Sequence, residues 1–190
     1  MPVKSVQDLL VHELQDIFHA EKQLVRALPK LAKAASHDEL RRAFQEHLEQ
    51  TKGQVERLEQ VFEALDKAPR GKRCEAMEGL VAEAQEALEE IQDPAVRDVA
   101  LIVAAQKVEH YEIAGYGSLV ALARQLGQEE AAGLLEQTLN EEKETDRKLN
   151  ELALARVNPD AEEGGEADEG EEDEAGGGRA GASRAGGRGG

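Results

Sequence analysis

The tetrapeptide Glu109-His110-Tyr111-Glu112 is the part of the chain best suited to chemistry, because it interrupts the apolar segment 99–126. A helix formed by that segment is apolar nearly all the way round and should be buried. Buried carboxylates are costly unless a cation, a proton or a hydrogen bond compensates them. Glu109 and Glu112 share one helical face, so the pair could hold one metal ion or bridge two. His110 points about one residue's rotation away from them.

Two further segments place carboxylates on apolar helical stripes. Glu21 falls on the line of Leu14, Ile17 and Leu24, and the alternative to a core role is that it reaches solvent or pairs with a buried Lys or Arg. Glu142 follows Leu135 and Leu139, and Asp146 lies one turn further on the same line. Both segments therefore offer candidate ligands at mid-helix.

His47 is the only imidazole whose helical position gives it clear access to the core, between Phe44 and Leu48. It could be a metal ligand, or a core histidine held by hydrogen bonds. Thr51, one turn further on, has a simple explanation, because its hydroxyl can bond back to the carbonyl of Glu46 or His47. Carboxylates with one or two imidazoles form a hard-to-borderline ligand set, which suits iron or manganese better than a structural zinc.

The elements that must position these residues are helices, because apolar residues recur at spacings of three and four. The expected helices cover about 5–35, 38–65, 75–91, 94–126 and from there to about 156. Two long hairpins joined by a linker that carries the short helix predict an antiparallel four-helix bundle with one crossover. Short matches, such as Leu-Glu-Gln-Thr at 48–51 and 135–138, are consistent with a repeated hairpin.

Composition narrows the class of protein. The 190 residues are 40% hydrophobic but only 3% aromatic, and no apolar run is long enough to predict a membrane span. A formal net charge of −17 argues against a folded body that binds nucleic acid through phosphate neutralisation. The N-terminus lacks the features of a signal peptide, and the single cysteine, Cys74, fits a reducing cytoplasm.

We expect two regions, a helical domain at 1–156 and a disordered tail at 157–190. The tail has an acidic block followed by a Gly/Ala/Arg segment, neither of which can bury enough surface to fold. Asn158-Pro159 is the expected stop of the last helix. The tail's alternative role is a weak nucleic-acid contact through Arg179, Arg184 and Arg188.

The ordered motifs resemble the YciE/YciF family of the ferritin-like superfamily. They are LLVHELQDIFHAEKQLVRALPKLAKAA, HLEQTKGQVERLEQVFEAL, the Cys74-x-x-Met77-x-Gly79-Leu80 segment, VEHYEIAGYG and LLEQTLNEEKETDRKLNELA. The resemblance covers about 4–156. It implies a ferritin-like bundle, commonly dimeric, in a bacterial cytoplasm and with a role in stress.

The wider superfamily places one Glu on each of the first and third long helices, and Glu-x-x-His on the other two. Glu21 matches the first position, and Glu109-x-x-Glu112 resembles the third-helix pair of rubrerythrin-like members. The fourth helix has Glu142-x-x-Thr145 in place of the histidine motif, and the second offers only His47 or Thr51-x-x-Gln54.

Two main functions follow from this pattern. One is a metal-binding protein in stress protection, with iron or manganese at a site that could be dinuclear and act on oxygen or peroxide. Its ligands would be Glu21, His47, Glu109, Glu112, Glu142 and Asp146, with His110 as a ligand or an outer partner. The other is a non-catalytic structural or interaction dimer with a vestigial site. Cage-type iron storage is a weaker third function.

Overall fold

A computed structural model describes residues 3–162, and within this range all regular structure is helical. The helices are α1 (Val6–Ala34), α2 (Asp38–Ala64), α3 (Glu75–Glu90), α4 (Pro94–Gln125) and α5 (Glu129–Leu152), and a short π-helix (Ala153–Val157) follows. The predicted all-α class and the four long helices with one shorter helix are confirmed, with bounds that differ by about one residue for the first four.

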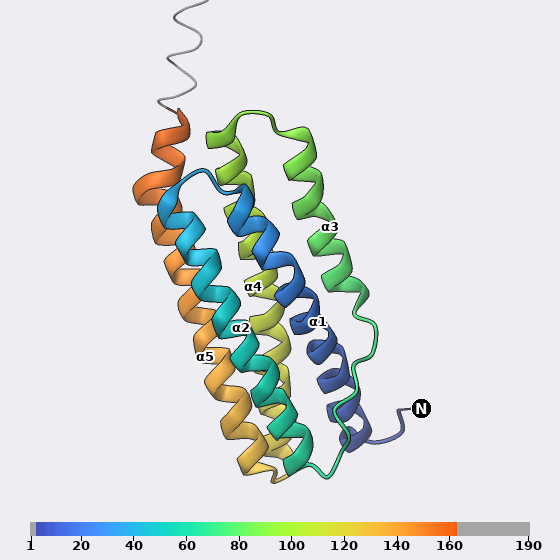
Figure 1. Cartoon of the computed structure of the whole chain (residues 1–190). Helices are drawn as coiled ribbons and strands as arrows, with labels where there is room; N and C mark the ends of the chain where they lie inside the picture. Colours follow the sequence, from blue (N-terminus) through green and yellow to red (C-terminus); the bar gives the residue numbers. More distant parts are fainter. Residues whose placement is uncertain (1–2, 163–190) are drawn as a thin grey trace, which may run out of the picture.

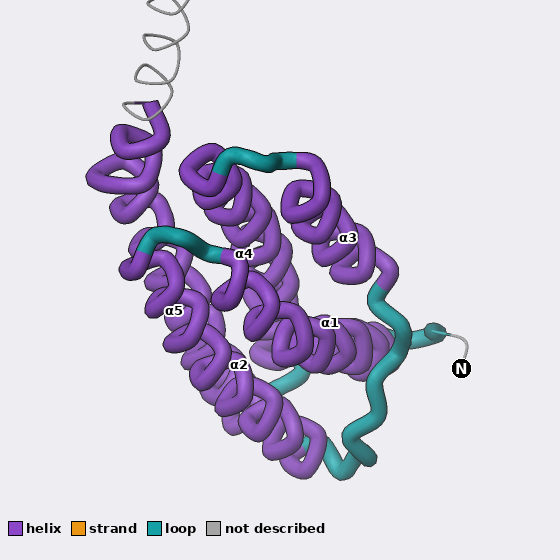
Figure 2. The backbone as a smooth tube through the Cα atoms, turned by 45° about the horizontal axis from the view of Figure 1, so that its top comes forward, coloured by secondary structure: helices purple, strands orange, loops and turns teal. Residues whose placement is uncertain are grey.

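The four long helices pack as two hairpins, α1 with α2 and α4 with α5, and the hairpins face each other through the α1–α4 and α2–α5 contacts. The shorter helix α3 lies outside this bundle against α1 and α4 (Figure 1). The segment between α2 and α3 runs along α1, where the Lys72 amide donates to the Gln15 carbonyl at 2.9 Å (Figure 2). The predicted crossover thus carries α3 across one face of the bundle.

Local sequence signals explain where the helices begin and end. Ser5 accepts a hydrogen bond from the Asp8 amide at the start of α1, and Asp93 accepts one from the Val96 amide at the start of α4. Pro94 occupies the first turn of α4, where its missing N–H costs nothing. Gly127 follows α4 with a φ of 69°, a left-handed conformation that favours glycine.

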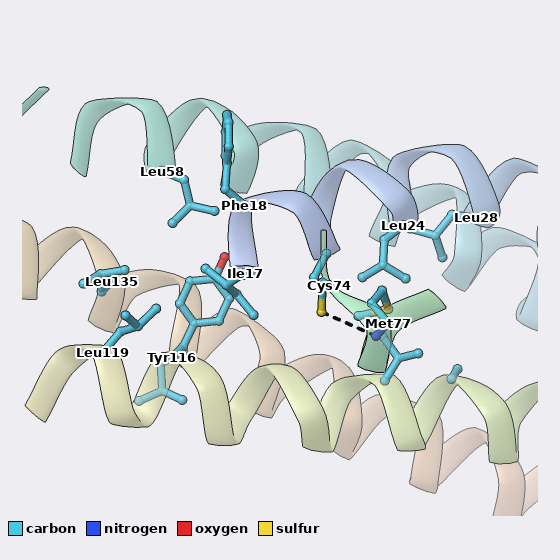
Figure 3. Packing of buried hydrophobic residues seen from close by; sticks show 14 of the residues in the cluster. Ile17, Phe18, Leu24, Leu28, Leu58, Cys74, Met77, Tyr116, Leu119 and Leu135 are labelled. Carbon is cyan, nitrogen blue, oxygen red and sulfur yellow. Dashed lines mark hydrogen bonds between the residues drawn. The ribbon is translucent and has the colours of Figure 1, made fainter. Parts of the chain in front are cut away.

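The apolar core fills the spaces between α1 and its neighbours. The rings of Phe18 and Phe62 meet edge to face with centroids 5.4 Å apart. Figure 3 shows Ile17 of α1 near Tyr116 of α4, and Met77 of the crossover near Leu24. The Cys74 thiol is buried and accepts from the Met77 amide, so that this cysteine begins α3.

The expected stop at Asn158-Pro159 is wrong. The helical chain passes from α5 through the π-helix and continues over residues 158–162. Asn158 is itself helical, and its amide donates to the carbonyl of Ala153 in the wider π register. Burial of Ala153 and Val157 against the bundle explains why packing overrides the bias of the proline. The rest of the predicted tail, residues 163–190, lies outside the described residues.

Candidate metal centre

The bundle interior holds a compact group of four buried potential ligands, namely His47, Glu109, Glu112 and Glu142. Each residue offers one ligand atom, and these atoms all lie within 4.8 Å of one another. His47 comes from α2, the two adjacent glutamates from α4, and Glu142 from α5. Four of the seven residues singled out in the sequence are therefore brought together at one point.

The α4 glutamates have carboxylate groups with no partner inside the protein. Both oxygens of Glu109 and both oxygens of Glu112 are buried without a hydrogen bond. One oxygen of Glu142 is also buried without a hydrogen bond. Buried polar atoms are normally satisfied, so five unpartnered carboxylate oxygens in one place are the kind of exception that a bound ion would explain.

His47 is placed to ligate through a neutral ring. Its Nδ1 lies 3.4 Å from Glu109 Oε1, and its Nε2 lies 3.8 Å from Glu142 Oε2. Burial lowers the pKa of His47 to about 4, so the imidazole is uncharged at neutral pH. One turn on, the Thr51 hydroxyl donates to the His47 carbonyl at 2.8 Å, one of the two bonds its sequence position suggested.

Burial and mutual repulsion favour the protonated form of the acids. The pKa values of Glu109 and Glu112 are well above the usual range, mainly because of burial and then because of neighbouring carboxylates. Burial raises the pKa of Glu142 to about 7. The group would therefore hold protons when no cation is present, and a metal ion would have to displace them.

Glu142 is supported by a chain of polar contacts that joins α2 to α5. The Gln54 amide donates to Glu142 Oε1, and also to Glu141 Oε2 at 3.3 Å. Glu141 in turn receives two hydrogen bonds from Arg57, at 2.8 and 2.9 Å, and Arg57 donates to Thr138 at 2.6 Å. Bidentate pairs of this kind have defined geometry, so the chain fixes where Glu142 can lie.

Glu21 approaches the group from α1 but is not one of its four members. One of its oxygens accepts a hydrogen bond from the Tyr116 hydroxyl, and the other is buried without a partner. The pKa of Glu21 is well above its usual range, because of burial and then because of Glu142. Glu21 is thus close enough to interact with the four-residue group and retains one free oxygen.

Asp146 and His110 are not among the four members of this group. Asp146 Oδ1 is 3.3 Å from His110 Nε2, and the His110 side chain is 72% exposed. Asp146 is half-buried, its Oδ1 atom is buried without a hydrogen bond, and its charge contributes to the raised pKa of Glu109.

Two functional positions were not found in the sequence. Arg57 and Glu141 form a half-buried ion pair beside Glu142, which the apolar stripes of the sequence do not indicate. The same stripes give no role to the Tyr116 hydroxyl, which donates to Glu21. A usable signal did exist, because Gln54 and Arg57 lie three residues apart, in the spacing of the missing Glu-x-x-His motif.

The set of one neutral imidazole and three carboxylates could hold a hard or borderline divalent cation such as iron or manganese. The described interior offers no lysine or arginine in direct contact with Glu109 or Glu112, so a bound cation is the compensation best suited to their charge. The outer chain through Gln54 resembles the second-layer hydrogen bonds that orient metal ligands in general.

The fold and this interior place the molecule among ferritin-like helical bundles. The chain belongs to the family described as a domain of unknown function, DUF892, which matches residues 5–162. Protein YciF of Escherichia coli (strain K12) is 53% identical over 163 residues, which are 85% of this chain and 98% of that protein.

Solved structures agree with this assignment. The crystal structure of the E. coli stress protein YciF has a TM-score of 0.79 and 54% identity, over 82% of this chain and 99% of that one. YcfI, a putative structural protein from Rhodopseudomonas palustris, has a TM-score of 0.77 and 46% identity, over 78% and 94%. A Xanthomonas campestris protein is 26% identical with a TM-score of 0.66, over 80% and 94%.

None of the helices within residues 3–162 has the length and apolar character that crossing a membrane would require.

The family match and the similar proteins confirm the resemblance to the YciE/YciF family. The ligand assignments stay predictions.

Proposed function

We propose that the protein binds iron or manganese in its interior and uses the bound metal in protection against stress. The observation that carries this proposal is the group of four ligand atoms within 4.8 Å of one another, with the Glu109 and Glu112 oxygens unpartnered. The E. coli relative, which is described as a stress protein, supports the biological setting.

In this proposal the chain's own residues hold and tune the site. His47, Glu109, Glu112 and Glu142 are the ligands, and Gln54 fixes the orientation of Glu142 through its amide. Glu21 extends the site toward a second ion through its free oxygen, which would make the centre dinuclear. A bound iron or manganese centre would supply one-electron redox chemistry toward oxygen or peroxide. Burial keeps bulk water away from the ligands.

Metal analysis of purified protein tests the proposal. We expect iron or manganese in the wild type, strongly reduced content in Glu112→Ala and Glu142→Ala, and normal content in the exposed-site control Glu144→Ala. A metal at 100 times its Kd should also raise the free energy of unfolding by about 2.7 kcal/mol. Negligible metal content that none of these substitutions changes would contradict the proposal.

A second function is supported by a different observation. The R. palustris relative is described as a putative structural protein, and Val96 and Val103, two turns apart on α4, are 46% and 49% exposed. We infer as the alternative a non-catalytic homodimer, in which the interior acids are hydrogen-bonded or protonated remnants of a metal site. This alternative predicts unchanged thermal stability in excess chelator and no oxidase or peroxidase turnover.

The size of the protein in solution distinguishes a dimer from a larger shell. We propose a homodimer in either case, and sedimentation velocity would distinguish a dimer from the shell that cage-type iron storage requires. We also propose a cytoplasmic location, which the unpaired, buried Cys74 supports because reducing compartments keep thiols free. Fractionation of cells that express the tagged protein checks the location.

A further inference from the structure

A small apolar cavity lies beneath α3, where this helix crosses α1 and α4. Its volume is about 30 Å³, and its walls are mostly Leu, Val and Ala side chains, such as Leu28 of α1, Val81 and Ala84 of α3, and Ala105 of α4. The lining becomes polar at two places, where His47 and Glu109 contribute to it and where the exposed residues Lys30 and Gln85 do. The cavity therefore adjoins the candidate metal centre on its apolar side.

The chemistry of the walls limits what can occupy this space. A cavity of about 10–15 Å³ is enough for one water, but a buried water needs two to four polar partners. The lining offers few polar groups. Those of His47 and Glu109 lie together at one place, and those of Lys30 and Gln85 lie where the space opens to solvent. Cavities with apolar walls take up apolar gases such as xenon.

A molecule bound in the cavity would lie in contact with two of the candidate metal ligands. His47 Nδ1 and Glu109 Oε1 are 3.4 Å apart, and both residues line the cavity while belonging to the four-residue group. A molecule in the cavity would touch the ligand set without displacing Gln54, which donates to Glu142, or Tyr116, which donates to Glu21, because neither residue lines the cavity. The role of α3, which takes no part in the ligand set, is then to close this space.

We propose that the cavity is a binding site for dioxygen, from which the gas reaches the metal centre. Dioxygen is small, diatomic and apolar, as this space requires. Peroxide and superoxide need hydrogen bonds that the walls do not offer. The use of the bound gas at a metal rests on the function proposed above, whereas binding of the gas does not require any metal.

Paramagnetic relaxation by dissolved dioxygen tests the binding step directly in metal-free protein. Dioxygen under a few bar of pressure should enhance the relaxation of methyl protons of Leu28 and Val81. The enhancement should be several-fold larger than at residues of matched burial that do not line the cavity, namely Leu58 as the match for buried Leu28 and Val55 as the match for half-buried Val81. Equal or smaller enhancement at Leu28 and Val81 would overturn the proposal, and this comparison needs no variant.

A filled cavity provides the second measurement. Ala84→Leu should abolish the extra relaxation at Leu28 and Val81, whereas Ala82→Leu, at an exposed position on the same helix, should leave it unchanged. In iron-loaded protein, Ala84→Leu should slow dioxygen uptake several-fold without changing iron affinity. Persistence of the relaxation in Ala84→Leu, or loss of relaxation with normal dioxygen uptake, would contradict the proposal.

The two proposals fail in different ways. If the wild type binds no iron or manganese, the proposed function fails, while the metal-free relaxation measurement still decides whether dioxygen occupies the cavity. If metal binds and dioxygen does not enter, the inference about the cavity fails alone.

Discussion

The two hairpins of the bundle contribute unequally to its polar interior. The hairpin α4–α5 supplies three carboxylates to the four-residue group, and the hairpin α1–α2 supplies one imidazole. The other buried polar residues of α1–α2 are hydrogen-bonded, Glu21 to Tyr116 and Gln54 to Glu142. One hairpin therefore carries most of the unsatisfied charge, while the other mainly holds partners in place.

This difference is informative because the hairpins share traces of a repeat. Glu21 and Glu112 follow a His-x pattern in their helices and are both buried, and Thr51 and Thr138 in the two Leu-Glu-Gln-Thr segments are both buried as well. In the same register Gln54 of α2 corresponds to Glu141 of α5, so an amide in one hairpin stands where the other has a carboxylate. The asymmetry thus comes from a few side chains within a common backbone arrangement.

The largest effect should come from an α4 ligand. Glu112→Gln keeps the volume and removes the charge, so metal affinity should fall by roughly 100-fold or more, beyond what loss of an outer hydrogen bond costs. Isothermal titration with Mn²⁺ or anaerobic Fe²⁺ measures this. Glu144→Gln, the same change on the exposed face of α5, is the control and should bind normally. An unchanged affinity in Glu112→Gln would remove α4 from the site.

The next effect tests whether α1–α2 acts by positioning. Gln54→Leu removes the amide that donates to Glu142 and keeps the bulk, so metal affinity should fall by about 10-fold. The same titration measures the loss. Gln54→Glu is the second variant to compare, because it places a carboxylate on α2 where the wild type has an amide. Raised metal affinity in Gln54→Glu and lowered affinity in Gln54→Leu would show that the α1–α2 hairpin can supply a carboxylate ligand, as the α4–α5 hairpin does.

Much of this arrangement could be predicted from the sequence, and the failures have physical causes. Periodicity located the helices, because burial of one face imposes spacings of three and four. Periodicity also identified five polar residues on otherwise apolar helical faces, namely Glu21, His47, Glu109, Glu112 and Glu142. Periodicity does not give the rotation of one helix relative to another.

Helix rotation and packing explain what sequence reasoning missed. Asp146 shares a helical line with Glu142 and is half-buried, but it is not one of the four residues whose ligand atoms lie within 4.8 Å of one another, and its place in the site stays a prediction. Arg57 and Glu141 were missed because partially buried pairs between helices leave no periodic signal in either helix. The continuation past Pro159 was missed because the sequence does not show the packing of Val157.

The pH dependence of stability provides a third test. An acid whose folded pKa is raised holds a proton that the unfolded chain has lost, so stability falls as pH rises from 4.5 to that raised pKa. For Glu142 this range ends at about 7, and the raised pKa values of Glu109 and Glu112 act in the same direction. His47 has the opposite effect, since its lowered pKa makes stability rise from about pH 4 to 6.5.

Above pH 6.5 His47 no longer changes the stability, and the buried glutamates still do. The free energy of unfolding of the metal-free protein should therefore fall as the pH rises. Glu112→Gln removes one such acid, so the slope should become less negative, by at most about 1.4 kcal/mol per pH unit. Urea unfolding from pH 6.5 to 8.5 with chelator measures the slopes. Saturating Mn²⁺ should oppose the decline, because binding requires the ionised carboxylates. Equal slopes for the variant and the wild type would mean that Glu112 is already ionised.

A smaller effect is expected from the acid of the first hairpin. Glu21→Gln should change the affinity for the first ion by only about threefold, close to the 0.6–0.7 kcal/mol that such a factor represents. It should remove a second ion if the centre is dinuclear, because Glu21 has one free oxygen beside the group. Metal stoichiometry by mass spectrometry under native conditions separates the two effects. A loss as large as that of Glu112→Gln would place Glu21 among the primary ligands.

The smallest effect is expected at the exposed pair, and it defines the boundary of the site. His110→Ala removes a side chain that is mostly in solvent and whose only close charged partner among the described residues is Asp146. Exposed substitutions usually change stability by about 0.5 kcal/mol or less, so metal affinity should stay within about twofold. Asp146→Asn should behave alike, because the carboxylate lies toward His110. If either variant lowers affinity tenfold, the pair belongs to the metal centre, and the contribution of α4–α5 extends beyond the four-residue group.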